Sequence, residues 1–241
     1  MKPAGHHALL ACDVFKEEIN HFVTASPPWC AAVFLEMGLH DRPDQLRQTV
    51  QQRIASLEAD HPQLQTILLA YGRCGNGLLG VRAERCRVIL PQAHDCISIL
   101  LGGRAQHDAV LKKNPGTYFY SPGWIRGKRV PGPDREQHLR ELYSERYGDD
   151  EEMLDELVDA DREAFAHHNR AVYLSIFNKP AAENYCRDCA SHQGWEFQCL
   201  KADPSFLLQL INRDWNSDRF LIVPPDHSIE ADSDGTLVAR P

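Results

Sequence analysis

Short apolar segments alternate with helix-prone segments along most of this chain, and this alternation limits the folds open to it. The clearest helical pattern covers residues 42–59. Its apolar residues recur at helical spacing, at Leu46, Val50, Ile54 and Leu57. The flanking segments TILLAYG (66–72) and CRVILP (86–91) are apolar throughout, which is typical of strands in a parallel sheet covered on both faces. The sequence therefore predicts an α/β fold with a mainly parallel, Rossmann-like sheet and helices on both faces.

The same alternation continues through the rest of the chain. Further strands are expected at 7–15, 30–40, 116–124, 171–178, 195–202 and, as the last strand, 219–227. Further helices are expected to begin near residue 16 and to cover 94–103, 180–194 and 204–215. The charged stretch 134–169 is expected to form two helices that break near Gly148, as an insertion or cap. A chain of 241 residues fits a single domain over 1–241, with a two-lobed arrangement left open.

Net charge and hydropathy limit the classes of molecule that this chain is expected to bind. The chain has 26 Lys and Arg against 34 Asp and Glu, a formal net charge of −8. We expect no nucleic-acid binding, because neutralising phosphates requires a surplus of cations. The longest apolar runs have strand length, so no membrane association is expected. The N-terminal apolar stretch meets Asp13 too early for a signal peptide, which predicts a cytoplasmic protein.

Eight cysteines are the unusual feature of the composition, and three of them follow the ends of separate predicted strands. These three are Cys12, Cys74 and Cys96. Because ligands collect beyond the carboxyl ends of parallel strands, we expect the three thiols to converge there. Three thiolates suit zinc, an iron–sulfur cluster or another thiophilic metal, and they leave a coordination position open for substrate. The alternative is that each is a small packed residue.

The other five cysteines divide into two groups. Cys30, Cys86 and Cys199 lie inside apparent strands and are expected in the core. Cys186 and Cys189 form a CxxC pair on one face of a predicted helix. Such a pair can bind a metal, form a redox couple or pack. No second CxxC stands at zinc-ribbon spacing, so a structural zinc module is not indicated.

The turn YGRCGNGLLG (71–80) is the most specific local element. Its glycines permit close approach of the backbone to a ligand, and a helix following the turn would present free N–H groups to an anion, a phosphate or a cluster sulfur. Gly75, Asn76 and Gly77 are therefore candidate cofactor-binding residues. Residues 75–80, GNGLLG, have the spacing G-x-G-x-x-G, but this spacing alone does not establish a dinucleotide fingerprint, and the turn contains no P-loop. A plain tight turn is the alternative.

Two further groups have candidate chemical roles. His94 can ligate a metal or act as an acid or base, with Asp95 orienting it or capping the next helix. His94 and Cys96 also form the minimum of a thiol nucleophile. Tyr120 and Trp124 can line a cofactor pocket or pack. The His pairs at 6–7 and 167–168 are expected to be exposed.

Several motifs together resemble the domain of unknown function 1638 family. They are YGRCGNGLLGV, LPQAHDCISILLGG, GTYFYSPGW and DRFLIVPPDHSI. The resemblance picks out Cys12, Cys74, His94, Asp95 and Cys96, with Gly116, Pro122, Gly123 and Trp124 nearby. It also implies a context, since genes with this pattern are often found beside corrinoid-dependent methyltransferases of anaerobes. The CxxC pair and the segment PPWC (27–30) are not part of the shared pattern.

The residues and the resemblance together favour a metalloprotein with a Cys-rich zinc or iron–sulfur site at the strand ends. We expect an enzyme with metal-dependent, transferase-type chemistry, linked to corrinoid and methyl-transfer metabolism. Its partners would be a small-molecule substrate and a corrinoid protein or methyltransferase. One alternative is an accessory metal- or cofactor-binding protein without turnover. Another is a metal-free thiol enzyme that uses Cys96 and His94.

Overall fold

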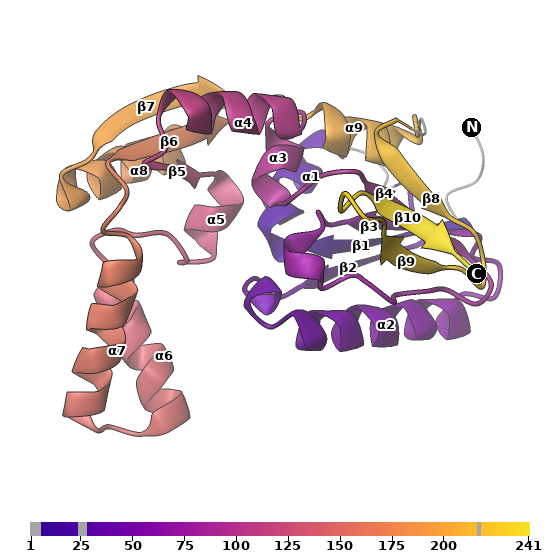
Figure 1. The fold of residues 1–241 in the computed structure, drawn as a ribbon, viewed down its shortest axis with the longest axis horizontal. Coiled ribbons are helices and arrows are strands. Elements are labelled where there is room, and N and C mark those ends of the chain that lie inside the picture. The colour runs from indigo at the N-terminus through magenta and orange to yellow at the C-terminus, as the bar shows by residue number, and fades with distance from the viewer. Residues whose placement is uncertain (1–5, 24–27, 216–217) are drawn as a thin grey trace. The chain divides into compact units, whose positions relative to one another are not determined.

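A computed structural model describes residues 6–23, 28–215 and 218–241. The chain divides into two compact units, residues 1–107 with 203–241 (unit 1) and residues 108–202 (unit 2). Each unit has its own parallel sheet, and the two are described in turn (Figure 1). No helix among these residues is long and apolar enough to cross a membrane.

Unit 1 is built on a five-stranded sheet in the order β2-β1-β3-β4-β8. The strands are β1 (His7–Cys12), β2 (Ala31–Leu35), β3 (Thr66–Ala70), β4 (Arg87–Pro91) and β8 (Phe220–Val223). The first four are parallel, and β8 pairs with β4 in the antiparallel sense. Every residue of β1 and β3 is buried, so both faces of the sheet are covered. The predicted α/β fold with a mainly parallel sheet is confirmed.

The helices of unit 1 follow the periodicity of the sequence. They are η2 (Asp13–Phe15), α1 (Lys16–Phe22), η3 (Leu39–Asp41), α2 (Pro43–Asp60), η4 (Cys74–Asn76), α3 (Cys96–Leu100), the start of α4 (Arg104–Lys113) and α9 (Ser205–Asn212). Helix α2 packs on β1 through the predicted apolar stripe, in which Leu46, Val50 and Ile54 are fully buried. Helix α9 packs on β3 and β4. Figure 1 shows α2 and α9 on opposite sides of these strands.

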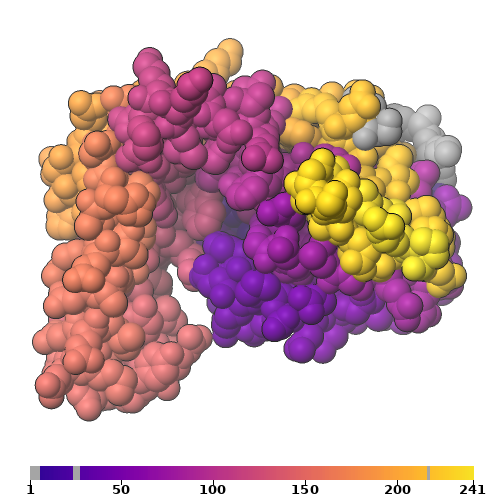
Figure 2. Space-filling model, viewed as in Figure 1, coloured from indigo at the N-terminus to yellow at the C-terminus, as the bar shows by residue number. Residues whose placement is uncertain are grey.

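Two strands follow the segment that was expected to be the last strand. They are β9 (Ser228–Ala231) and β10 (Leu237–Arg240), which pair in the antiparallel sense. Each has only four residues, which is too short for sequence patterning to give a strong signal. In Figure 2 this C-terminal hairpin, in yellow, lies on the surface of unit 1, where Ser228 bridges to Arg82.

Unit 2 contains a three-stranded parallel sheet in the order β5-β6-β7. Its elements are β5 (Thr117–Tyr120), α5 (Pro122–Arg126), α6 (Arg135–Tyr147), α7 (Glu151–Ala164), β6 (Arg170–Ser175), α8 (Pro180–Gln193) and β7 (Glu196–Lys201). Helix α8 packs on β6 and β7 and ends at Gly194, whose φ of 69° is left-handed, as the sequence predicts.

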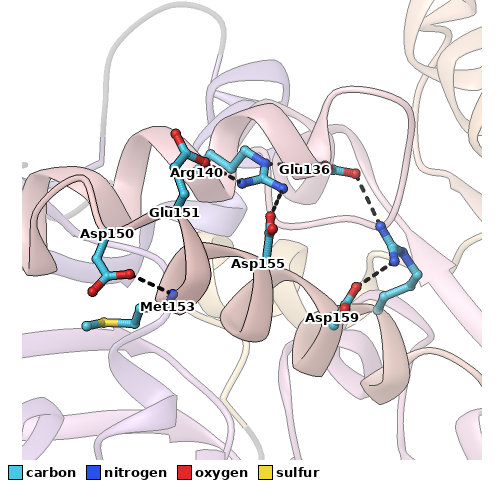
Figure 3. A network of polar contacts seen from close by, with 8 residues as sticks. Glu136, Arg140, Asp150, Glu151, Met153, Asp155 and Asp159 are labelled. Atoms are coloured by element: carbon cyan, nitrogen blue, oxygen red, sulfur yellow. Dashed lines mark hydrogen bonds and ion pairs between the residues drawn. The ribbon is translucent and has the colours of Figure 1, made fainter.

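The charged stretch 134–169 forms the two expected helices, which contact each other as a hairpin broken at Gly148. Arg140 of α6 forms ion pairs with Glu136 of α6 and with Glu151 and Asp155 of α7 (Figure 3). Nine acids and one Arg lie in residues 149–163, a net charge of −8 that equals the net charge of the whole chain. The rest of the chain is therefore balanced in charge.

Candidate functional site

Three thiols meet at the carboxyl ends of neighbouring strands in unit 1. Cys12 ends β1, Cys74 begins the short helix η4 that follows β3, and Cys96 is the first residue of α3, after β4. Because β1, β3 and β4 are adjacent and parallel, their carboxyl ends lie at one edge of the sheet. Cys96 lies beside both Cys12 and Cys74, and these two neighbours affect the pKa of its thiol. The three cysteines are 5%, 8% and 6% exposed in chain order, so the thiols form a nearly closed cluster.

The pKa values of the Cys12 and Cys96 thiols are shifted in opposite directions. Hydrogen bonding with Cys96 lowers the pKa of the Cys12 thiol, although burial opposes the shift. Hydrogen bonds with Cys12 and Cys74, together with burial, raise the pKa of Cys96 well above its ordinary range. Of these two thiols, Cys12 is the one whose ionised form is favoured by its neighbour.

Tyr71 is a member of this cluster that sequence reasoning missed. It directly follows β3 and is 2% exposed, and burial raises the pKa of its hydroxyl well above the ordinary range. The hydroxyl lies beside the Cys12 thiol, yet it makes no well-aligned hydrogen bond with any described residue. Its position as the first residue of YGRCGNG, at a strand end, is the signal that could have identified it.

The backbone of the turn that carries Cys74 is strained. Cys74, Gly75 and Asn76 have φ values of 46°, 65° and 69°, three left-handed residues in succession. For the two that are not glycine, this conformation costs about 1–3 kcal/mol each. Two hydrogen bonds tie the turn to the next loop, from Arg73 N to Ala93 O at 2.9 Å and from Cys74 N to His94 O at 3.2 Å. The strain is thus maintained by the loop that carries Cys96, and strained backbone of this kind is concentrated at functional sites.

The helix expected after this turn is absent, because the chain passes from η4 through turns to β4. The expected anion site at a helix N-terminus is therefore wrong. Gly77 has a packing role, since a Cβ there would lie 2.7 Å from Leu46 Cδ2. Gly75 and Asn76 are exposed at the tip of the turn. Cofactor binding by these three residues stays a prediction.

Asp95 combines the two roles that the sequence left open. Its Oδ1 accepts hydrogen bonds from Ser98 N at 2.7 Å and Ser98 Oγ at 2.6 Å, which caps α3. Burial alone would raise the pKa of Asp95, but these hydrogen bonds outweigh it and the pKa is lowered. Its Oδ2 lies 3.0 Å from His94 Nδ1 and orients the imidazole. The half-exposed His94 ring lines an open cavity.

In the part of the chain that the structure describes, no group of three or more His, Cys, Asp or Glu side chains has its donor atoms arranged to hold a metal ion. The three thiols lie close together, and binding a metal would require them to lose their protons. The three cysteine sulfur atoms therefore lie close together, but they are not positioned as the ligands of a metal ion. The roles of Cys12, Cys74, Cys96 and His94 in metal binding stay predictions.

Comparison with known proteins agrees with the motifs. The family model described as "Protein of unknown function (DUF1638)" matches residues 34–211, most of the chain. This chain belongs to the DUF1638 family. The match includes Cys74 and His94–Cys96, whereas Cys12 lies before it. No curated protein and no solved structure matches the chain.

The aromatic candidates of this DUF1638 protein, Tyr120 and Trp124, belong to unit 2. Tyr120 is fully buried, and its hydroxyl donates to Pro131 O at 2.7 Å. Trp124 packs against the apolar cluster of unit 2 that contains Tyr120. Packing in unit 2 thus accounts for both residues, and their contribution to a cofactor pocket stays a prediction.

The CxxC pair also belongs to the core of unit 2. Cys186 and Cys189 are fully buried against Tyr120 and Tyr173. A Cβ at Gly132 would lie 2.5 Å from Cys189 Sγ, which shows how tightly the chain packs there. Burial raises the pKa of Cys189 to about 12 and raises that of Cys186 still further. Both thiols are therefore protonated at neutral pH.

Five predictions about exposure are corrected, and one of them concerns His6, which is half-buried. Cys199 is exposed on β7, and Cys30 is half-buried just before β2, whereas Cys86 is buried as expected. His7 is 4% exposed rather than solvated, and its ring packs edge-on against Trp215. His168 is half-buried among aromatic rings, with its centroid 5.3 Å from that of Tyr118. The sequence failed here because exposure depends on which elements cover a residue.

Proposed function

We propose that this DUF1638 protein binds a zinc ion or an iron–sulfur cluster through Cys12, Cys74 and Cys96 and uses it as an enzyme. The convergence of three thiols from three adjacent strand ends carries the proposal. The buried Tyr71 hydroxyl, which has no well-aligned partner among the described residues, supports it as well. A buried polar group without a partner is uncommon, and it marks a place where a further atom is needed.

The donor chemistry of the cluster suits such a centre. Thiolates are the ligands of iron–sulfur clusters and of many zinc sites, and binding requires loss of the thiol protons. The lowered pKa of Cys12 makes it the first thiolate to become available. When bound, a centre held by three cysteines would supply an open coordination position, at which a substrate thiol, hydroxyl or carboxylate is activated.

The neighbouring residues of the chain have separate tasks. Asp95 fixes the orientation of His94 through Nδ1, which leaves Nε2 to accept or donate a proton. Tyr71 can donate its hydroxyl hydrogen to a buried thiolate. The strained turn at Cys74 holds that thiol against the loop of Cys96.

The finer assignment is transferase chemistry in a cytoplasmic protein, on a small-molecule substrate and with a corrinoid protein or methyltransferase as partner. Its corrinoid part depends on the family resemblance alone. An accessory metal carrier without turnover uses the same cluster and is the alternative. A metal-free nucleophile at Cys96 has less support, because Cys96 has a raised pKa and lies beside two thiols, whereas the His94 ring pairs with Asp95.

The test is elemental analysis with a visible spectrum on protein purified without oxygen. The wild type is compared with a Cys12→Ser/Cys74→Ser/Cys96→Ser triple variant and with a Cys186→Ala/Cys189→Ala control. We expect stoichiometric metal in the wild type and in the control, and none in the triple variant. Iron with visible absorption identifies a cluster, and zinc without colour identifies a Lewis-acid site.

Two outcomes contradict the proposal. One is a wild-type protein without metal even after reconstitution with iron and sulfide or with zinc. The other is equal metal content in the wild type and in a folded triple variant, which would return the three cysteines to ordinary packing.

A further inference from the structure

A cavity of about 390 Å³ opens in unit 1 beside the candidate site. It lies at the loops that follow β3 and β4, where ligands of parallel sheets collect. Its charged lining consists of Arg73, His94, Arg104, Asp218 and Asp234. Arg73 immediately precedes Cys74 in the chain, so the cavity adjoins the turn that carries one of the thiols.

Arg73 is held firmly but is not fully bonded. Its Nη1 donates to Gly235 O, in the β9–β10 turn, at 2.9 Å. A Cβ at Gly235 would lie 2.5 Å from that same Nη1, so the turn rests directly on the guanidinium. The Arg73 Nε is buried and has no hydrogen-bond acceptor among the described residues. A buried, charged donor of this kind indicates an acceptor that the protein does not supply.

The carboxylates of the lining do not supply that acceptor. Asp234 is used within its own turn, where its Oδ1 accepts from Thr236 N at 2.8 Å. Asp218 is exposed. On the cationic side, Arg104 adds a second guanidinium, and His94 has one ring nitrogen not used by Asp95.

We propose that this cavity binds a small oxyanion, the carboxylate or phosphate group of the substrate, with Arg73 as its main recognition residue. Guanidinium groups match the planar geometry of such oxyanions and bind them by charge-assisted hydrogen bonds. The inference deepens the proposed function and rests on it for the chemistry that follows binding. Recognition itself needs no metal, so it can be measured separately.

The test is isothermal titration of the full-length protein, in chloride buffer without added metal, with sodium phosphate and in parallel with sodium succinate. We expect saturable binding of at least one probe, and the preferred probe tells a phosphate substrate from a carboxylate substrate. Arg73→Gln is expected to weaken binding about tenfold or more, the effect of losing a charge-assisted hydrogen bond. Arg53→Gln, which removes the same charge from the exposed side of α2, is the matched control and is expected to bind as the wild type does.

A second variant covers the case in which Arg73→Gln does not fold. Arg104 is exposed at the cavity, and Arg104→Gln is expected to weaken binding about threefold or more. The proposal is overturned if neither probe saturates up to about 10 mM. It is also overturned if the folded Arg variants at the cavity bind as tightly as Arg53→Gln. Cys74→Ser, titrated in parallel, is expected to lose metal but keep the oxyanion, which separates failure of this inference from failure of the metal site.

Discussion

Unit 1 and unit 2 each contain a group of buried cysteines, and the two groups differ in almost every respect. In unit 1, Cys12, Cys74 and Cys96 come from segments far apart in the sequence and meet at strand ends. In unit 2, Cys186 and Cys189 are neighbours on helix α8 and lie in the apolar core. The unit 1 thiols lie beside one another at strand ends and next to Tyr71, whereas those of unit 2 are surrounded by packed side chains.

The two groups differ because of where they lie in the fold, and spacing along the sequence does not reveal that difference. The CxxC pair is the more conspicuous pattern, yet burial raises the pKa of both its thiols. The scattered trio includes the one cysteine in the chain whose pKa is shown to be lowered, Cys12. The direction of the pKa shift at Cys12, rather than spacing along the sequence, distinguishes the two groups.

The largest expected effect is on metal content. We expect Cys74→Ser to reduce bound metal to below about a tenth of the wild-type amount, because one of three thiolates is lost. Cys186→Ala is expected to leave metal content unchanged. Elemental analysis of oxygen-free preparations measures both, and equal losses in the two variants would abolish the distinction between the units.

The second largest expected effect is a loss of stability when the core of unit 2 is changed. Cys186→Ser places a hydroxyl among Tyr120, Tyr173 and Val130 with full burial, and we expect a loss of about 1–3 kcal/mol in the free energy of unfolding. Urea unfolding followed by far-UV circular dichroism measures it. Cys199→Ser, on the exposed side of β7, is the control and should be nearly neutral. A neutral Cys186→Ser would mean that this thiol already has a polar environment.

The contribution of the Glu58 carboxylate to stability, at the start of β4, is expected to depend on pH. The Glu58 carboxylate is 6% exposed and accepts from the backbone N–H groups of Glu84, Arg85 and Cys86. Burial would raise the pKa of Glu58, but these hydrogen bonds outweigh it and lower the pKa below its ordinary 4.5. A lowered carboxyl pKa stabilises the fold fully above pH 4.5, and that contribution is lost as the pH falls through the folded-state value.

We therefore expect Glu58→Gln to lose about 1–2 kcal/mol of stability near pH 7 and to approach the wild type as the solution is acidified. Glu84→Gln removes the same charge at an exposed position and serves as the control. Urea unfolding across this pH range measures the difference. A deficit independent of pH would show that the charge of Glu58 is not what stabilises this strand.

The smallest expected effect distinguishes the helix-capping role of Asp95 from the effect of its charge on stability. Asp95→Ala removes the cap of α3 and should cost about 1 kcal/mol, whereas Asp95→Asn keeps a capping oxygen and should cost a few tenths. Thermal or urea unfolding measures both. If Asp95→Asn were as destabilising as Asp95→Ala, the charge facing His94 would matter more to stability than the cap.

Much of the fold was predictable because it is encoded locally. The buried residues of α2, the end of α8 at Gly194 and the break at Gly148 follow from spacing and from residue type. The short strands β9 and β10 were missed because four residues with mixed polarity give no distinct period. The helix expected after the glycine turn was wrong because the turn is held by the adjacent loop instead.

The sequence by itself determined most of the order of strands and helices, although α4, β9 and β10 were missed. It also determined the placement of three cysteines at strand ends and membership of the DUF1638 family. The tertiary structure alone decided that the thiols lie next to each other, that Tyr71 lies beside them and that Arg73 meets the turn at Gly235. The physical reason is the distance along the chain over which each kind of signal acts. Periodicity records which side of an element is buried, whereas a hydrogen bond between residues far apart in the chain depends on how the strands are ordered and what packs over their ends.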